Sequence, residues 1–133
     1  MAIQQSLNDT SGISGSLNNI GIVYKMLGDT AKALVYYNRA MDLEKKINAK
    51  RGLANTYNNL GTLYEAEKDF NRALAYYMQS LDLRKEINDR IGISTSLSNI
   101  GAVYEEMKDY SKGEQYELQA LGISREIGDL EGV

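Results

Sequence analysis

Hydrophobic side chains recur at three- and four-residue steps along the chain, which is the period of an α-helix. One stripe predicts a helix over residues 10–27, and its members are Ile13, Leu17, Ile20, Tyr24 and Leu27. A second stripe predicts a helix over residues 30–47, and its members are Ala33, Tyr37, Ala40, Met41 and Ile47. Because the chain contains no proline, nothing interrupts these helices, and we expect an all-α fold.

The whole pattern returns after 40 residues without a gap, as Tyr24, Tyr64 and Tyr104 illustrate. We therefore predict one array of repeats, with these parts: 1–9, the end of a preceding partial repeat; 10–48, 49–88 and 89–128, three repeats; 129–133, the start of a truncated fourth. Terminal repeats normally change their pattern to solvate the last face, and these do not. This favours an excised piece of a longer array. The alternative is a very short array that has no matched caps.

Polar residues predict where the helices begin and end. Asp29, Asp69 and Asp109 each stand where an N-cap accepts backbone N–H bonds. Asn48 and Asn88 can adopt the left-handed conformation that closes the second helix of a repeat. The loops are so short that consecutive helices must lie antiparallel. The mixed charges around Glu44 and Arg84 read as solvated helix ends.

Gly21, Gly61 and Gly101 lie in the middle of predicted helices, where glycine costs about 1 kcal/mol relative to alanine. We expect close helix–helix approach at these positions, with small partners on the second helix. These partners would be Ala33, Ala73, Ala40, Ser80 and Ala120. Tyr24, Tyr64, Tyr104, Tyr37 and Tyr77 would fill the surrounding space, and Tyr36, Tyr76 and Tyr116 the next inter-repeat contact. An isolated helix pair would leave half of its apolar stripe wet, so the repeats must stack.

The segment Leu17-x2-Ile20-Gly21-x2-Tyr24, followed by Ala33 twelve positions after the glycine, resembles the tetratricopeptide repeat (TPR). A period of 40 without proline is similar to the longer-helix subclass, which includes the Pins/LGN adaptors and many bacterial signalling and regulatory proteins. The resemblance implies a superhelical solenoid of antiparallel helix pairs that acts as a protein-interaction scaffold. The third repeat departs from the pattern at Gly113 and Glu117, so we expect its second helix to be the loosest.

The resemblance also implies that the first helices line a concave groove, and a peptide segment of a partner is the expected ligand. The expected peptide-binding residues are Asn18, Asn19, Ile22, Asn55, Asn58, Asn59, Thr62, Glu65, Thr95, Ser98, Asn99, Glu105 and Glu106. An asparagine side chain both donates and accepts, so it can satisfy a peptide backbone of any sequence. For Asn19, Asn59 and Asn99 the alternative is a structural role, in which they bond neighbouring helices and fix the stacking.

The charges on this face bear on the partner. Glu65, Glu105 and Glu106 favour a basic or amphipathic segment, although a plain solvated face would look the same. TPR proteins that clamp the carboxylate of a chaperone tail use lysine and arginine on this face. The corresponding positions here are mostly Asn, Ser, Thr and Glu, which disfavours that function.

Self-association is the second functional hypothesis. The second helix of the third repeat has no following helix to cover its apolar face, and an exposed face of this kind commonly becomes an interface. Head-to-tail contact through it would give a homo-oligomer. The expected self-association residues are Tyr116, Ala120, Leu121 and Ile127.

Composition narrows the remaining function classes. The chain of 133 residues has no cysteine and no histidine, which excludes disulfides, zinc fingers and relays based on those residues. We find no phosphate loop or calcium loop either, and expect no enzyme activity, metal or cofactor. A net charge of −3 argues against nucleic acid, and no apolar run approaches membrane-spanning length. The N-terminus lacks a signal peptide, so a cytoplasmic location is expected.

Overall fold

The computed structural model describes the backbone of residues 2–131 and the side chains of residues 9–128. Over this part of the chain the structure consists of six α-helices and contains no strand. The helices are α1 (Ala2–Met26), α2 (Thr30–Lys46), α3 (Lys50–Ala66), α4 (Phe70–Glu86), α5 (Arg90–Glu106) and α6 (Tyr110–Glu131). The predicted all-α class is confirmed.

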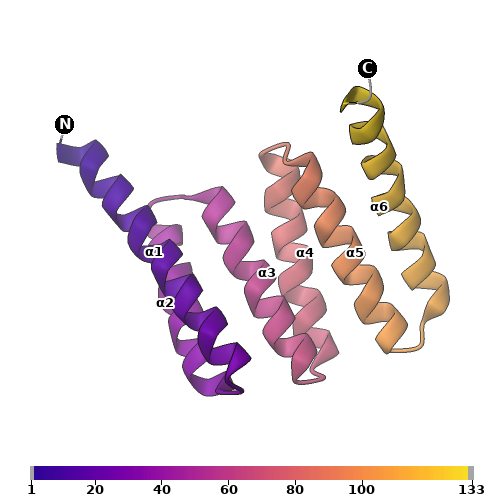
Figure 1. Cartoon of the computed structure of the whole chain (residues 1–133), viewed down its shortest axis with the longest axis horizontal. Coiled ribbons are helices and arrows are strands. Elements are labelled where there is room, and N and C mark those ends of the chain that lie inside the picture. Colours follow the sequence, from indigo (N-terminus) through magenta and orange to yellow (C-terminus); the bar gives the residue numbers. More distant parts are fainter. Residues whose placement is uncertain (1, 132–133) are drawn as a thin grey trace.

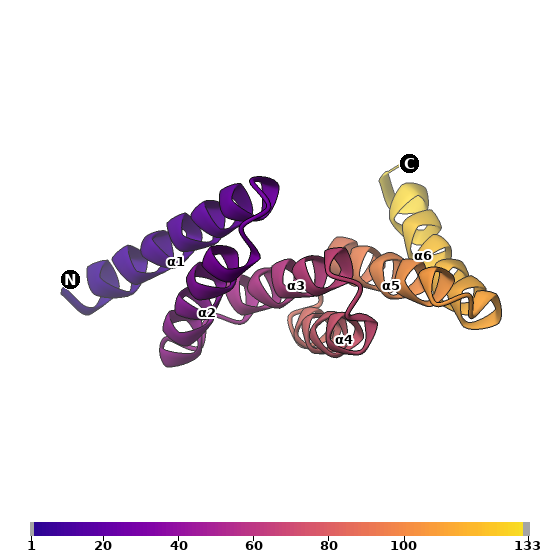
Figure 2. The ribbon, with the colours of Figure 1, turned by 90° about the horizontal axis from the view of Figure 1, so that it is seen from below.

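The helices form three antiparallel pairs, α1–α2, α3–α4 and α5–α6, stacked one after another (Figure 1). The second helix of each pair packs against the first helix of the next, α2 on α3 and α4 on α5. Seen from below, α1, α3 and α5 follow one another along the molecule, while α2 and α4 lie below them (Figure 2). The architecture is therefore the predicted superhelical solenoid, and α1, α3 and α5 are the helices available to line a common face.

The predicted helix boundaries are explained by the caps. The carboxylates of Asp29, Asp69 and Asp109 accept hydrogen bonds from backbone N–H groups three residues later, at 3.1, 3.2 and 3.3 Å. Asn48 and Asn88 have φ angles of 53° and 55°, which is the left-handed conformation that was expected of them. These predictions are confirmed, and they account for the short, sharp turns between helices.

The two outer helices are longer than expected. The four inner helices each have 17 residues, whereas α1 has 25 and α6 has 22. No turn separates residues 2–9 from the rest of α1, so the expected tail of a preceding repeat is continuous with the first helix. The expected start of a fourth repeat at residues 129–133 lies outside the described side chains.

The core runs between the helix pairs, and its composition corrects the predicted stripe of α1. Leu60 in α3 and Ile100 in α5 are both fully buried, but Ile20, which occupies the same column in α1, is 39% exposed. Ile13 and Leu27 are exposed too. In α3 and α5 this column shares a core cluster with residues of the second helix of the preceding repeat, Leu60 with Tyr37 and Ile100 with Tyr77. No such helix precedes α1 in the described chain, so the predicted burial of its stripe is wrong there.

The mid-helix glycines do mark close approach, but the partner is an aromatic ring. A Cβ added at Gly21 or Gly61 would lie 2.5 Å from a ring carbon of Tyr37 or Tyr77, respectively. Both tyrosines are almost completely buried, and each ring lies where a side chain at the glycine would be. The expected reason for the glycines is therefore right, while the expected small partners are not what approaches them.

In the third repeat the two helices also approach closely at the glycine, but other residues make the contact. Glu117 replaces the tyrosine, and a Cβ at Gly101 would lie 3.1 Å from both the Glu117 carboxylate and the carbonyl oxygen of Gly113. A Cβ at Gly113 would in turn lie 2.8 Å from Cγ of Glu105. Because two glycines face each other, α6 packs on α5 about as extensively as α4 packs on α3. In the described chain α6 packs on α5 alone, whereas α2 and α4 each also pack on a following helix, so the expectation that the second helix of the third repeat is the loosest stays a prediction.

Six other tyrosines stack in pairs within a repeat. The rings of Tyr36, Tyr76 and Tyr116 stack on those of Tyr24, Tyr64 and Tyr104, and all three pairs have centroids 5.6 Å apart. Each pair joins the two helices of one repeat. The expectation that this column fills the next inter-repeat contact is therefore not met by these ring contacts, which stabilise the helix pair instead.

Candidate binding groove

A ladder of asparagines connects the first helices. The side-chain amide of Asn59 in α3 donates to Oδ1 of Asn18 in α1 at 3.4 Å, and that of Asn99 in α5 donates to Oδ1 of Asn58 in α3 at 2.8 Å. Asn19, the first member of the column, is exposed. The structural alternative thus describes what Asn59 and Asn99 do in the free chain. Their contact with a peptide stays a prediction.

Asn18 also belongs to a buried polar network, which the sequence did not predict. Its Nδ2 donates to Oγ1 of Thr56 at 2.8 Å, and this hydroxyl donates in turn to Oε1 of Glu44 at 2.5 Å. Glu44 is 1% exposed, so the expectation of a solvated helix end is wrong. Burial raises the pKa of Glu44, and the hydroxyls of Thr56 and Ser14 beside it offset part of that rise.

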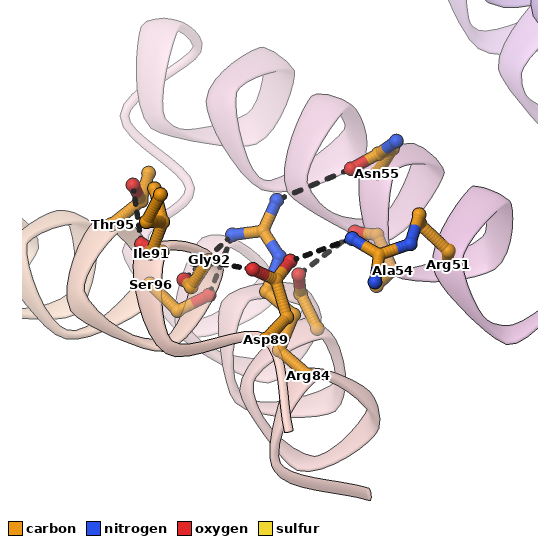
Figure 3. A network of polar contacts seen from close by, with 10 residues as sticks. Arg51, Ala54, Asn55, Arg84, Asp89, Ile91, Gly92, Thr95 and Ser96 are labelled. Carbon is orange, nitrogen blue, oxygen red and sulfur yellow. Dashed lines mark hydrogen bonds and ion pairs between the residues drawn. The ribbon is translucent and has the colours of Figure 1, made fainter. Parts of the chain in front are cut away.

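The same column carries a buried cation one repeat later. Arg84 is 7% exposed, and its guanidinium donates to the carbonyl oxygen of Gly92 at 3.1 Å, to Ser96 Oγ at 2.8 Å and to Asn55 Oδ1 at 3.4 Å (Figure 3). Burial lowers the pKa of Arg84, and the charge of Asp89 opposes that change. A sequence signal did exist, since Glu44 and Arg84 lie four residues after Ala40 and Ser80 and so continue the buried face of the second helix.

Two cavities open among the predicted groove residues. One of about 460 Å³ lies at the junction of α1, α2 and α3, and Asn18 and Asn55 line it. The other, of about 300 Å³, lies at the C-terminal ends of α1, α3 and α5, where Thr62, Glu65 and Glu106 line it. The two cavities are separate, and both are lined by residues of the first helices, which is where the sequence placed the groove.

The second cavity combines charges of both signs. Burial and a hydrogen bond shared with Glu106 raise the pKa of Glu65, although the Tyr77 hydroxyl, which donates to Glu65 at 2.7 Å, acts in the opposite direction. That shared bond and Lys68, 3.3 Å away, lower the pKa of Glu106. Lys25 also lines this cavity. This end of the groove therefore carries both carboxylates and lysine ammonium groups.

The other predicted groove residues differ in accessibility. Ile22, Asn55, Thr95, Glu105 and Glu106 are exposed, whereas Asn58, Asn59, Thr62, Glu65, Ser98 and Asn99 are half-buried. The Thr62 hydroxyl donates to the Asn59 carbonyl of its own helix, and the Ser98 hydroxyl points to Glu117 of α6 at 3.5 Å. Thr95 lines a third, smaller hollow beside Ile127. We call the surface formed by these eleven residues the groove face.

The predicted self-association residues do not form one exposed patch. Ala120 is 3% exposed, and Tyr116 stacks on Tyr104, because both side chains pack against α5. Among the described side chains of α6, the exposed large hydrophobic residues are Leu121, which was predicted, and Tyr110 and Leu118, which were not. Ile127 is half-buried beside Ile91. Of the four predicted residues, only Leu121 belongs to the exposed surface of α6.

The repeat pattern, the stacked helix pairs and the glycine–tyrosine contacts can now be set beside known proteins. The sequence matches the tetratricopeptide repeat family over residues 12–86 and again over residues 52–126. The chain belongs to the TPR family. No curated protein has a sequence that matches it. TPR domains are protein-interaction modules rather than typical enzymes, so the chain has the architecture of a protein-interaction scaffold.

Solved structures place the TPR fold beyond doubt. The chain is 27% identical to BtubC (BKLC) from P. vanneervenii with a TM-score of 0.81, and the match covers 86% of this chain. It covers only 48% of BtubC, so the chain spans about half the length of that protein. The N-terminal domain of stress-induced protein-1 (STI-1) from C. elegans is 20% identical, with a TM-score of 0.72 and coverage of 92% of this chain and 97% of that domain.

The TPR domain of Arabidopsis FLU is 17% identical, with a TM-score of 0.77, and the match covers 85% of this chain and 95% of that domain. At such identities the last two structures show the shared fold alone. Among the described residues, none of the TPR helices is long and apolar enough to cross a membrane. The described side chains also include no cluster of acidic residues placed to hold a metal ion.

Proposed function

We propose that this TPR array is an adaptor that binds an extended or helical peptide segment of a partner protein along the groove face. The observation that carries the proposal is the pair of cavities, about 460 and 300 Å³, that open beside the first helices: amide and hydroxyl side chains line the first, and the Thr62 hydroxyl lines the second together with charged side chains. Such groups can bond a peptide backbone, while the cavities can take side chains. The resemblance to the 40-residue subclass, with its Pins/LGN-type adaptors, supports the same role.

A selection of random peptides tests this function. We expect 12-residue peptides displayed on phage to be enriched on the immobilised chain, and the enriched peptides to bind in fluorescence anisotropy. Asn55→Ala and Thr62→Val each remove one polar group from a cavity wall, so together they should weaken binding about tenfold, which corresponds to about 1.4 kcal/mol. Thr62→Val keeps the shape of the side chain, and its hydroxyl bonds only its own helix.

The matched control is Gln79→Ala, at an exposed position of α4 away from the groove face, which should leave the affinity unchanged. Enrichment of no peptide above background would contradict the proposed function. An equal loss of affinity in Gln79→Ala and the groove variants would contradict the placement of the peptide.

A second candidate function, head-to-tail self-association, is favoured by the two uncovered end faces. Leu118 and Leu121 of α6 are 58% and 45% exposed, although Leu81, the counterpart of Leu121, is 5% exposed where α4 meets α5. The exposed Ile20 of α1 is the counterpart of Leu60 of α3, which is fully buried in a cluster with Ala33 and Tyr37 of α2. Stacking α1 of one copy on α6 of another would repeat the contact that joins consecutive repeats.

Sedimentation velocity over a wide range of protein concentration tests the second candidate. We expect the sedimentation coefficient of the wild-type chain to rise with concentration, and Leu121→Glu to abolish the rise by placing a charge in the apolar contact. Val35→Glu, at an apolar but exposed position of α2, is the control and should still associate. A wild-type chain that stays monomeric at every concentration would rule out this function.

A further inference from the structure

The cavity at the junction of the first two repeats, called the first junction below, has a buried carboxylate in its wall. It lies where α2 ends and α3 begins, against the middle of α1, and its volume is about 460 Å³. Glu44, a carboxylate that is 1% exposed, forms part of this wall, together with the small residues Ser11, Gly15 and Ala49. A buried carboxylate beside an open space of this size requires an explanation, because burying a charge is costly unless it is paired.

The second junction, 40 residues later, shows what fills this space when the side chains are larger. Every one of these four wall positions carries a bigger residue there. The counterparts of Ser11, Gly15, Glu44 and Ala49 are Arg51, Asn55, Arg84 and Asp89. They form a closed network in which Asn55 and two groups of α5 accept hydrogen bonds from the Arg84 guanidinium, while Arg51 pairs with Asp89 (Figure 3). The cavity at the first junction is therefore the space left by shorter side chains.

The charge at the two junctions is opposite. The Arg84 guanidinium has three oxygen acceptors and a carboxylate, Asp89, close enough to stabilise its charged form. Glu44 receives a hydrogen bond from the Thr56 hydroxyl, and among the described side chains no ion pair includes it. The two cations on the cavity rim, Lys50 and Arg51, are paired with other carboxylates. Their partners are Glu86 at 3.4 Å and Asp89 at 3.3 Å.

We propose that this cavity, called the Glu44 cavity below, binds the guanidinium group of an arginine side chain supplied by the bound peptide. The inference rests on the proposed function and adds to it the chemistry of one anchor residue. A guanidinium is planar and weakly hydrated, and it donates to a carboxylate in a fork, so it suits a buried acceptor better than an ammonium does. The second junction shows that this fold accommodates a buried guanidinium beside the same kinds of neighbours, namely a hydroxyl, a glycine carbonyl and an asparagine.

Titration with a single-residue probe tests the Glu44 cavity directly. The probe is Nα-acetyl-arginine amide, and its neutral counterpart Nα-acetyl-citrulline amide has nearly the same shape without the charge. We expect the arginine probe to produce saturable shifts in the backbone amide NMR signals of Gly15, Asn18 and Gly52, all of which line the cavity. The citrulline probe should produce none. Equal shifts with both probes, or shifts spread along the whole chain, would overturn the proposal.

Glu44→Gln is the decisive variant, because it keeps the shape of the side chain and removes the charge. It should weaken binding of the arginine probe at least tenfold. The variant is not expected to unfold: burial raises the pKa of Glu44, so this group favours the folded state below its unfolded pKa and loses that contribution as the pH rises through the folded pKa. At neutral pH the melting temperature of Glu44→Gln should therefore equal or exceed that of the wild type. Below the unfolded-state pKa of the carboxyl group, Glu44 is neutral and the variant should not melt at a higher temperature than the wild type.

Two further variants complete the test. Glu114→Gln changes the net charge by the same amount at an exposed position of α6, and it should bind the arginine probe like the wild type. Gly15→Asn leaves Glu44 in place but narrows the cavity, because nothing lies within 4 Å of a Cβ at residue 15 and the new side chain has room. It should also weaken probe binding. Unchanged probe binding in Glu44→Gln or in Gly15→Asn would overturn the proposal.

The two proposals fail in different experiments. If selected peptides bind through Asn55 and Thr62 but bind Glu44→Gln as tightly as the wild type, the arginine anchor is refuted and the adaptor function stands. If no peptide is enriched, the adaptor function is refuted, and the probe titration still decides whether the Glu44 cavity takes a guanidinium.

Discussion

Replacing Leu60 by alanine is expected to lower the free energy of unfolding by about 3 kcal/mol, within the range found for large-to-small changes in protein cores. The Leu60 side chain is fully buried between α3 and its neighbours, in a cluster that also contains Tyr37 of α2 and Tyr57 of α3. The truncation would remove contacts that join the first two repeats and leave a void. Urea unfolding followed by far-ultraviolet circular dichroism would measure the change.

The matched control for this prediction is Ile20→Ala. Ile20 occupies the same column one repeat earlier but is 39% exposed, so its truncation should cost less than about 1 kcal/mol. Equal losses at both positions would mean that the exposed face of α1 is covered in solution. If that cover is a second copy of the chain, the loss in Ile20→Ala would grow with protein concentration, which links this measurement to the self-association hypothesis.

This comparison also shows how far repetition in a sequence predicts a fold. The 40-residue register predicts the helices, because each repeat has its own stripe, cap and turn residues, and these act locally. Asp29 and Asn48 do what their positions indicate regardless of what surrounds them. Burial is different, since it depends on the next helix along the array. Ile20 and Leu60 have the same place in the pattern and different environments.

The polar part of the candidate site was harder to predict for a related reason. Glu44 and Arg84 stand in runs of charged residues at the end of a helix, which usually face solvent. Their burial follows from the face of the second helix that they continue, and the residue type alone conceals it. The Glu44 cavity depends on a further step, namely the spatial meeting of columns from α1, α2 and α3. No single column of the sequence contains that information.

The asparagines illustrate a third limit. Their recurrence predicted one role for all three repeats, but only Asn59 and Asn99 bond the preceding repeat, and the recurrence could not distinguish bonds within the array from bonds to a ligand. In the structure the side-chain amides of Asn59 and Asn99 each donate one hydrogen bond to an asparagine of the preceding repeat. A half-buried asparagine nevertheless keeps lone pairs and a second N–H group, so contact with a peptide stays compatible with the ladder.

Replacing Gly61 by alanine is expected to lower the free energy of unfolding by about 2 kcal/mol. The new Cβ would lie 2.5, 2.6 and 3.0 Å from three ring carbons of Tyr77, which is far inside van der Waals contact. Tyr77 cannot easily move, since it is 1% exposed and its hydroxyl is hydrogen-bonded to Glu65. Overpacking of this kind costs about 3 kcal/mol at its upper range, and the better helix propensity of alanine returns about 1 kcal/mol.

Gly15→Ala separates the steric effect at Gly61 from the propensity effect. Gly15 also lies inside a helix, but nothing lies within 4 Å of a Cβ placed there, so alanine should raise the free energy of unfolding by about 1 kcal/mol. Chemical denaturation of the two variants beside the wild type would therefore give changes of opposite sign. A stabilised Gly61→Ala would show that the Tyr77 ring can leave its place, and close approach would then no longer explain the glycine column.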